Sequence, residues 1–246
     1  MKTAILTPLG NSTHHEFTRS LALSYRALPD VEWFHLPAVS DVAGARNHLL
    51  AVFLQTRAEI ALWIDSDQSF TPNCIKAVRL PIEMGDAELV TGFVPYKLPG
   101  KLQFNVMLRP EDRSETGYIG ERSEIDGFKY ARVKYAGTGF WAMSRAAILK
   151  ACKTVPSYHP TFAIRREAMP GAVPTSSDEL HANLFEHAII DHWRFGEDIG
   201  ASRTFGKLGM DIWLSLDTRI QHFDGNLGYG DRQPLDIDQY AKTRGP

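Results

Sequence analysis

The sequence has few cysteines and no long apolar run. Two of its 246 residues are cysteine, Cys74 and Cys152, and their spacing fits no metal motif. Such low cysteine usage predicts reduced thiols in a cytosolic compartment. No stretch approaches the roughly 18–20 apolar residues of a membrane-spanning helix, and the apolar run at the N-terminus is too short for a signal peptide. We therefore expect a soluble, cytoplasmic protein without membrane contact.

Excess charge, repeats and low-complexity tracts are also missing. The formal net charge is −2 at pH 7, so overall charge gives no reason to expect nucleic acid as a partner, although a locally basic face is compatible with it. Apolar residues make up 43% and charged residues 23%, which is ordinary for a globular protein of one domain. We expect a single domain over residues 1–246, with a proline-rich loop or lid over residues 153–178.

Strand and helix patterns alternate through the first hundred residues. Strands are predicted over residues 3–7, 31–36, 60–64 and 88–91, with helices over residues 13–28, over residues 42–56 and from Pro72. Thr13 with Glu16 fits a capping box, and Thr71 with Pro72 fits an N-cap followed by a first-turn proline. This order predicts an α/β fold with a Rossmann-like, mixed but mostly parallel sheet flanked by helices. Ligands of such sheets bind beyond the carboxyl ends of the strands.

The second half of the chain is less regular. Strands are predicted over residues 128–135, 140–143, 212–216 and 219–222. Gly137-Thr138-Gly139 separates the first two of them, and helices are predicted to begin after Ser144 and near Glu197.

Two aspartates follow the most apolar of the predicted strands, in the run Asp65-Ser66-Asp67. Residues i and i+2 of a strand point the same way, so these carboxylates can converge on one point. Both stay ionised comfortably only with a cation between them, and oxygen ligands suit Mg²⁺ or Mn²⁺. Such an ion can stabilise a diphosphate leaving group. The alternative is a pair of capping aspartates before the next helix. A second copy, Asp236-Ile237-Asp238, follows no apolar strand and is predicted to be a solvated turn.

Other short segments are spread over nearly the whole chain in a fixed order. They are Leu6-Thr7-Pro8, Ala45-Arg46-Asn47, residues 63–72, residues 92–97, Gly137-Thr138-Gly139-Phe140 with Ser144-Arg145, Gly196-Glu197-Asp198-Ile199, and His222-Phe223-Asp224-Gly225. In this order and spacing, the chain resembles the GT-A glycosyltransferases, most closely the compact, unanchored members of phage and large-virus genomes. The run Q-x-x-R-W of processive synthases is missing, which favours transfer of one sugar.

The resemblance implies a metal-dependent enzyme that moves a sugar from a nucleotide-diphosphate donor, by family frequency a UDP-sugar, in the host cytoplasm if the chain is viral. Residues 1–100 would form the donor half and residues 101–246 the acceptor half. Thr7 and Pro8 would line the nucleoside pocket, Arg46 would meet the ribose or phosphate, and Ser66 would lie at the donor.

The same resemblance assigns the metal and the chemistry. Asp65, Asp67 and His222 would hold the ion, with Asp67 as the most direct ligand; the imidazole favours Mn²⁺ over Mg²⁺. Asp198 would be the general base, supported by Glu197, if the enzyme inverts the anomeric centre. Retention and inversion both stay open, and a helix start decorated with acids is the alternative.

Gly137, Thr138 and Gly139 would let the donor or acceptor approach the backbone, and a β-bulge is the structural alternative.

Three questions stay open at this stage. One alternative function is a haloacid-dehalogenase-type, Mg²⁺-dependent phosphatase, although the paired aspartates of that class follow its first strand. Another is a non-catalytic nucleotide- or sugar-binding module, which would need no general base. The acceptor is unassigned. One hypothesis is a hydroxylated base in modified viral DNA, because basic residues between Lys97 and Lys134 alternate with Tyr118, Phe128, Tyr130 and Tyr135. A solvated charged loop is the alternative. The oligomeric state is also open.

Overall fold

An eight-stranded mixed sheet forms the centre of the molecule. The structure is a computed structural model, which describes residues 1–9, 13–37, 41–97, 106–107, 122–160, 180–225 and 227–229. The strand order is β2-β1-β3-β10-β5-β15-β8-β7. The strands are β1 (Thr3–Pro8), β2 (Val31–Leu36), β3 (Ile60–Ile64), β5 (Leu89–Gly92), β7 (Arg122–Ile125), β8 (Phe128–Val133), β10 (Phe140–Ser144) and β15 (Ile212–Ser215).

Parallel pairing dominates the first-half strands, while β10 is antiparallel to both of its neighbours, β3 and β5, and β8 is antiparallel to β15. The predicted α/β class with a mostly parallel sheet is therefore confirmed.

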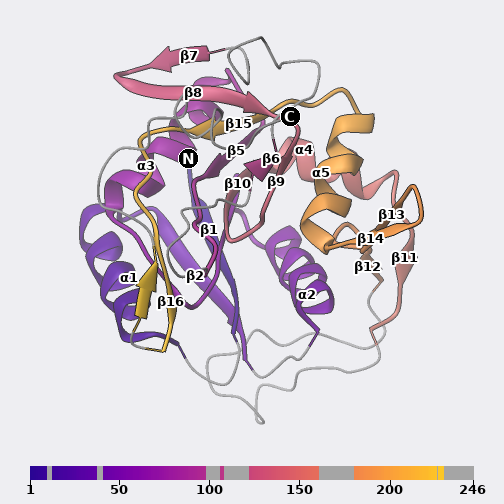
Figure 1. Cartoon of the computed structure of the whole chain (residues 1–246), viewed down its shortest axis with the longest axis horizontal. Helices are drawn as coiled ribbons and strands as arrows, with labels where there is room; N and C mark the ends of the chain where they lie inside the picture. The colour runs from indigo at the N-terminus through magenta and orange to yellow at the C-terminus, as the bar shows by residue number, and fades with distance from the viewer. Residues whose placement is uncertain are drawn as a thin grey trace.

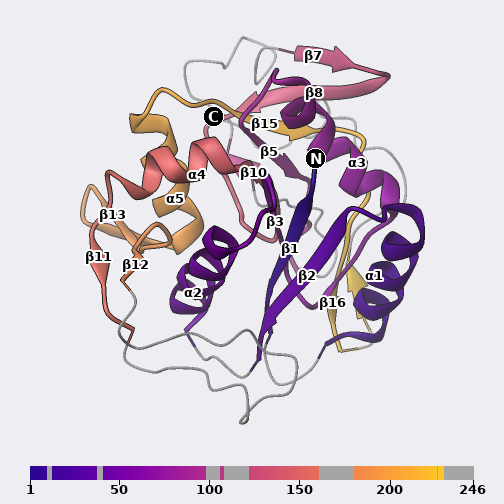
Figure 2. The ribbon, with the colours of Figure 1, turned by 180° about the vertical axis from the view of Figure 1, so that it is seen from behind.

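Helices cover both faces of this sheet. They are α1 (His15–Ala27), α2 (Val42–Gln55), α3 (Pro72–Met84), α4 (Arg145–Cys152) and α5 (Glu197–Lys207). Figure 1 shows α1 and α3 on one side of the strands and α2, α4 and α5 on the other, and the reverse view in Figure 2 agrees. The two apolar cores divide in the same way, one containing Phe17 and Ile75 and the other containing Leu49, Ile148 and Phe205.

Alternation along the strands explains this layering. Ala61 and Trp63 of β3 face the core under α2, whereas Ile60, Leu62 and Ile64 face the core under α3. Successive strand residues point to opposite faces, so a strand covered on both sides must be apolar throughout. Every residue of β3 is fully buried.

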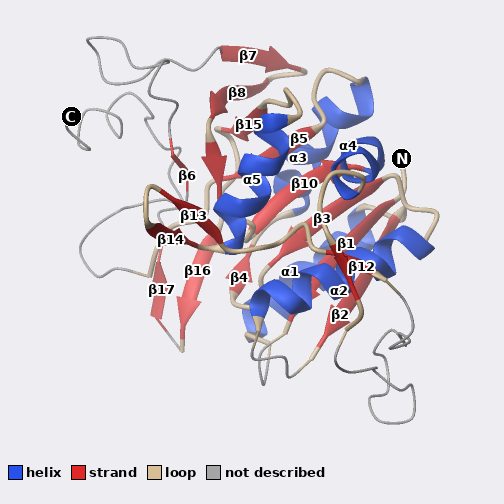
Figure 3. Ribbon diagram, turned by 90° about the vertical axis from the view of Figure 1, so that its right-hand side faces the viewer, coloured by secondary structure: helices blue, strands red, loops and turns tan. Residues whose placement is uncertain are grey.

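Short strands extend the fold around the carboxyl edge of the parallel strands. They are β4 (Gln68–Ser69), β6 (Val106–Met107), β9 (Tyr135–Ala136), β11 (Ser157–Tyr158), β12 (His181–Ala182), β13 (Ala188–Ile190), β14 (Trp193–Phe195), β16 (Gln221–Asp224) and β17 (Leu227–Tyr229). β4 pairs with β16, and β16 pairs with β17 (Figure 3). The late strand β16 therefore lies against the segment that follows β3.

Several local predictions are confirmed and one is wrong. Thr71 caps α3 and Ser144 caps α4, each through a side-chain oxygen that accepts a backbone N–H. Thr13 is not the cap of α1. His14 takes that position, and its Nδ1 accepts from the N–H of Glu16 at 3.3 Å. The late strand predicted over residues 219–222 instead begins at Gln221.

Part of the predicted lid over residues 153–178 and the second aspartate pair, Asp236 and Asp238, lie outside the described residues. Within the described ranges, no helix combines the length and the apolar character needed to cross a membrane.

Candidate active site

Residues from both halves of the chain meet at the carboxyl edge of β3. Asp65 directly follows that strand, and its backbone N–H donates to the carbonyl of Gly139 at 3.1 Å. Gly139 directly precedes β10. This strand pairs antiparallel with β3, and Phe140 lies opposite Ile64 in the register. The sheet register therefore places the predicted glycine segment beside the first predicted aspartate.

Arg46 connects three of the predicted segments. Its Nη2 lies 2.8 Å from Oδ1 of Asp65, its Nε donates to Oε1 of Glu197 at 3.3 Å, and its Nη1 donates to the carbonyl of Thr138 at 3.5 Å. The Arg46 side chain is only 3% exposed. Burial disfavours its charge, but the two carboxylates outweigh burial and raise the pKa of Arg46. Arg46 is thus a buried cation that fixes one acid from each half of the chain.

Asp67 contacts a different pair of cations. Its Oδ2 lies 2.5 Å from Nζ of Lys97, and its Oδ1 lies 3.2 Å from Nε2 of His222. Burial alone would raise the pKa of Asp67. The opposite effect of His222 and Lys97 is larger, and it lowers the pKa to about 2. The Asp67 carboxylate is therefore ionised, and among the described residues it shares no partner with Asp65.

Backbone contacts fix His222 opposite Asp67. The N–H of Phe223 donates to the carbonyl of Asp67 at 2.8 Å, and the pairing of β16 with β4 sets His222 opposite Gln68. On the imidazole, Nδ1 lies 2.9 Å from the carbonyl of Pro95. Because a carbonyl only accepts, Nδ1 carries the proton in this contact. Burial disfavours the charged ring, but Asp67 and the Pro95 carbonyl raise the pKa of His222. Nε2 donates to Asp67 while the ring is protonated, and it is the nitrogen that gains a free electron pair when the ring loses a proton.

Gly139 makes room for the aspartate segment. A Cβ on Gly139 would lie 2.5 Å from Nε2 of Gln68 and 3.1 Å from Oδ2 of Asp65. Gln68 is fully buried, and neither of its amide atoms has a hydrogen-bond partner among the described residues. Any side chain at position 139 would therefore displace Gln68 or Asp65. Close approach of backbone to side chain accounts for this glycine.

Glu197 and Asp198 begin α5. The Oδ1 of Asp198 accepts from the N–H of Ile199 at 2.7 Å, and a Cβ on Gly196 would lie 2.7 Å from that oxygen. Burial is the main influence on Asp198 and, with Glu197 nearby, raises its pKa. The helix predicted to begin near Glu197 is confirmed. The two acids differ: Glu197 binds Arg46, whereas Asp198 lies against its own helix turn.

The proposed nucleoside end of the site lies on β1 and β2. Thr7 is fully buried, and its hydroxyl accepts from Nε1 of Trp33 at 3.0 Å. Pro8 ends β1 and pairs with Leu36 of β2. The Trp33 ring stacks on that of His35 with centroids 4.4 Å apart.

Ser66 is tied to the first helix, because its carbonyl accepts from the N–H of His14 at 3.0 Å.

The fit of a metal ion depends on Asp67 and His222. Among the described residues, no three His, Cys, Asp or Glu side chains form a group that could hold a metal ion. The pair nevertheless offers a carboxylate and an imidazole nitrogen, which are ligand types that Mn²⁺ accepts. Substrate phosphates and water commonly supply the remaining ligands of such ions. The residues therefore fit an ion that binds together with a diphosphate. Asp65, the third predicted ligand, does not form a group with this pair in the described part of the chain, and its Oδ1 is held by Arg46.

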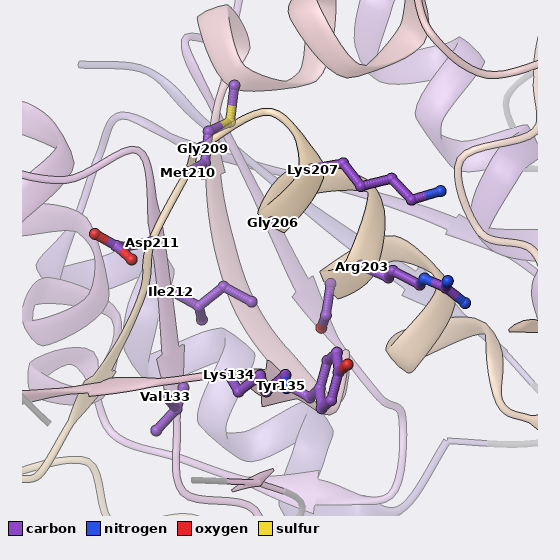
Figure 4. A pocket seen from close by; sticks show the side chains of 11 residues that line it. Val133, Lys134, Tyr135, Arg203, Gly206, Lys207, Gly209, Met210, Asp211 and Ile212 are labelled. Atoms are coloured by element: carbon purple, nitrogen blue, oxygen red, sulfur yellow. The ribbon is translucent and has the colours of Figure 1, made fainter. Parts of the chain in front are cut away.

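A separate cavity of about 400 Å³ lies at the far end of α5. Figure 4 shows Arg203 and Lys207 extending in the same direction over Tyr135, and Lys134 also lines the cavity. With 1.5 Å of rise per residue, the length of α5 puts Lys207 about 15 Å from Glu197. Lys134 and Tyr135, from the basic, aromatic stretch that motivated a DNA acceptor, therefore line this separate cavity, whereas Lys97 of the same stretch contacts Asp67.

Three contributors to the site were not identified from the sequence. Lys97, which contacts Asp67, and the Pro95 carbonyl, which contacts His222, both belong to the segment 92–97, but neither was assigned a role of its own from the sequence. The third is Trp33, which donates to the Thr7 hydroxyl. The position of Lys97 shortly after β5 was a usable signal, because the carboxyl end of β5 lies at the same edge of the sheet as that of β3.

Comparisons with known proteins concern the family and the fold of the chain. The model of the family described as Glycosyl transferase family 2 matches residues 12–151, more than half of the chain. Among solved structures, A197 from STIV has a TM-score of 0.57 at 17% identity, over 94% of this chain and 90% of that one. GalNAc-T7 with UDP, GalNAc and Mn²⁺ has a TM-score of 0.49 at 10% identity, over 99% of this chain and 47% of that one. No curated protein matches the sequence.

The family match favours a glycosyltransferase over the phosphatase and the non-catalytic binding module. The likeness to A197 is one of fold, because the identity is low. The family match covers the Asp65–Asp67 segment, Arg46 and the glycine segment. The chain therefore belongs to glycosyl transferase family 2, and it is a glycosyltransferase of the GT-A fold that depends on a nucleotide sugar.

Proposed function

We propose that the chain transfers a single sugar from a UDP-sugar to a hydroxyl group of its acceptor, with Mn²⁺, in preference to Mg²⁺, held by Asp67 and His222. The observation that carries this proposal is the 3.2 Å approach of His222 Nε2 to Asp67 Oδ1, with His222 Nδ1 held by the Pro95 carbonyl. A metal-binding histidine typically donates its other ring N–H to a carbonyl or carboxylate, as Nδ1 of His222 does to the Pro95 carbonyl.

Binding of the donor follows from the arrangement along the edge. Thr7 and Pro8 would line the nucleoside pocket, and Ser66 would lie between them and the diphosphate. The backbone at Gly137, Thr138 and Gly139 would face the sugar. Arg46 is engaged by protein on all three nitrogens, so we propose that it acts chiefly by fixing Asp65 and Glu197. Asp65, the third predicted ligand, would support the metal from beside Asp67.

In the proposed reaction, Asp198 takes the proton of the acceptor hydroxyl as the oxygen attacks the anomeric carbon of the donor. The bond between that carbon and the diphosphate breaks, and the nucleoside diphosphate leaves with the electron pair. When bound, the metal ion supplies positive charge beside the departing diphosphate. Burial of Asp198 raises its pKa and so makes it a stronger base than an exposed aspartate. Glu197 keeps Arg46 in place and so supports this geometry.

Thermal unfolding with UDP, GDP, CDP and ADP, each with and without Mn²⁺, tests the donor and the metal together. A ligand at about a hundred times its dissociation constant adds roughly 2.7 kcal/mol to the free energy of unfolding. For a domain of this size this raises Tm by roughly 5–10 °C. We expect UDP to stabilise the protein only when Mn²⁺ is present.

The variant Asp67→Asn should remove that shift, while Asp86→Asn, on the exposed turn after α3, should retain it. A UDP shift of full size without metal, or in Asp67→Asn, would contradict the proposed metal site. If UDP produces no shift under any condition while another nucleotide does, the donor base is wrong.

A further inference from the structure

A polar cavity of about 700 Å³ lies beside the first turns of α2, and none of the roles above uses it. Its walls come from the start of α2, from the β11–β12 pair and from the segment before α5. The residues that concern its chemistry are Asp41, Asn47, His48, Tyr158, Glu186 and Arg194. The volume lies in the usual range of small-molecule sites, about 300–1,000 Å³.

The cavity shares two structural elements with the acidic site. Asn47 lines the cavity and directly follows Arg46, which binds Asp65 and Glu197. Glu186 lines it as well, and a Cβ on Gly200 would lie only 1.8 Å from the Glu186 carbonyl oxygen. The Glu186 backbone therefore rests directly on the first turns of α5, the helix that begins with the proposed base. A molecule in the cavity would lie next to both elements that position the reacting groups.

The lining is rigid on one side. Asn47 donates to Oδ1 of Asn183 at 3.0 Å and to the carbonyl of Phe185 at 3.1 Å, and it accepts from the N–H of Phe185 at 2.8 Å. Three hydrogen bonds to the chain on the other side of the cavity hold that wall on α2. A preformed wall binds a ligand with less ordering cost than a flexible one.

Rings and carboxylates provide the recognition groups. The ring of His181 packs edge-on against those of His48 and Tyr158, with centroids 5.0 Å and 5.9 Å apart. Asp41 and Glu186 are exposed carboxylates at the cavity. A carboxylate accepts from hydroxyl donors, and the Arg194 guanidinium donates to hydroxyl oxygens, so this set suits a molecule that carries several hydroxyl groups. The rings give apolar surface against which the CH groups of a sugar can pack.

Charge argues against a polyanion in this cavity. The negative charges of Asp41 and Glu186 outnumber the positive charge of Arg194 at the cavity. Burial and the neighbouring His181 lower the pKa of His48 to about 4, so His48 adds no positive charge at pH 7. A phosphate backbone requires a surplus of cations, which these groups do not provide. A neutral polyol meets no such penalty.

We propose that this cavity is the acceptor site and that the acceptor is a neutral carbohydrate. The proposal rests on the proposed function, because only a sugar transfer gives the cavity an acceptor to hold. It replaces the modified DNA base as the acceptor and locates the acceptor between α2 and the segment that leads into α5. The bond-making step is unchanged: the carbohydrate hydroxyl loses its proton to Asp198 as its oxygen attacks the donor sugar.

Saturation-transfer NMR tests the cavity directly. The probes are the methyl glycosides of glucose, galactose, mannose and N-acetylglucosamine, added to the protein with UDP and Mn²⁺. We expect at least one glycoside to receive saturation from the protein. Tyr158→Ala and Glu186→Gln should each reduce that signal at least fivefold. The matched control Glu88→Gln removes an exposed carboxylate at the start of β5 and should leave the signal unchanged.

The UDP-dependent rise in Tm distinguishes failure of the acceptor site from failure of the proposed function. If it is retained in Tyr158→Ala and Glu186→Gln, these variants are folded and bind donor, so a lost glycoside signal reports the cavity. Glycoside binding that neither substitution affects overturns the acceptor site, as does a wild-type protein that binds UDP but none of the glycosides. Failure of UDP to bind the wild type overturns the proposed function instead. Retention of a duplex DNA in a gel shift at physiological salt, lost in Tyr158→Ala, would overturn the carbohydrate assignment.

Discussion

The ammonium group of Lys97 lies 2.5 Å from Oδ2 of Asp67, whereas His222 contacts the other oxygen, Oδ1. Lys97 thus occupies part of the space around the aspartate that a metal ion would use. Both side chains are about one-third exposed, so water screens their attraction. A protein cation and a divalent ion therefore compete for the same carboxylate.

This competition predicts tighter metal binding when the lysine is removed. Lys97→Met should raise the affinity for Mn²⁺ about two- to fivefold, because an ion pair of this exposure contributes up to about 1 kcal/mol. Electron paramagnetic resonance of free Mn²⁺ during a titration measures the affinity. Lys76→Met, on the exposed face of α3, is the control. Weaker Mn²⁺ binding in Lys97→Met would instead mean that Lys97 helps to build the metal site.

Removal of Arg46 should destabilise the whole protein. Arg46→Met leaves Asp65 and Glu197 without their buried cation, and loss of one partner of a buried ion pair typically costs about 3–5 kcal/mol. Urea unfolding followed by tryptophan fluorescence measures the free energy of unfolding. Arg26→Met, at the exposed end of α1, should change it little. A loss below about 1 kcal/mol in Arg46→Met would show that Arg46 does not hold the two acids together.

Gly139→Ala should impair donor binding through Gln68 and Asp65. The new methyl group would lie 2.5 Å from Gln68 Nε2, so one of the two side chains must move. We expect the UDP-dependent rise in Tm to fall by at least half, and the double variant Gly139→Ala with Gln68→Ala to recover part of it. The control Gly206→Ala meets nothing within 4 Å and should be neutral or stabilising. An unchanged UDP shift in Gly139→Ala would remove the case for close packing at this residue.

Asp198 gives a prediction about pH. A base must be ionised, so UDP-sugar turnover should fall as the pH drops through the Asp198 pKa, which burial holds above the ordinary 3.8. For stability the sign is opposite. A raised acid pKa favours the protonated folded state, so this contribution is complete below pH 3.8 and is lost as the pH rises through the folded pKa.

At pH 7, Asp198→Asn should therefore abolish turnover while leaving Tm equal to or above that of the wild type. Turnover is measured as release of UDP and Tm by calorimetry, with Asp86→Asn as the control for loss of one carboxylate. Retained turnover in Asp198→Asn would exclude Asp198 as the base.

The regular elements were predictable because their patterns are long and local. β3 is apolar throughout because helices cover both of its faces, and α3 carries its own start signal in Thr71 and Pro72. Two-residue strands such as β4 have no room for a period, so their existence depends on distant partners. The predicted cap residue of α1 was wrong for the same reason. The His14 ring stacks on Phe223 with centroids 4.2 Å apart, a contact that no local pattern contains.

Among the site residues too, those next to a strong local pattern were predictable and those that depend on the assembled sheet were not. Asp65 and Asp67 follow a strong strand and could be placed from the sequence. The roles of Lys97 and the Pro95 carbonyl depend on where β5 ends relative to β16, which is a property of the assembled sheet. Arg46 was found, but its partners were not, since Asp65, Thr138 and Glu197 come from three distant segments.

The placement of β10 between β3 and β5 has a consequence for the growing chain. Both strands are made well before β10, which pairs with each of them and separates them in the sheet. Until Phe140 to Ser144 leave the ribosome, β3 and β5, which are fully buried in the folded protein, have edges that lack their final partner. Such edges favour pairing with other chains, and non-local pairing forms slowly. A fragment that ends before β10 should therefore aggregate during synthesis, and the cell's chaperones would have to protect the nascent chain over that interval.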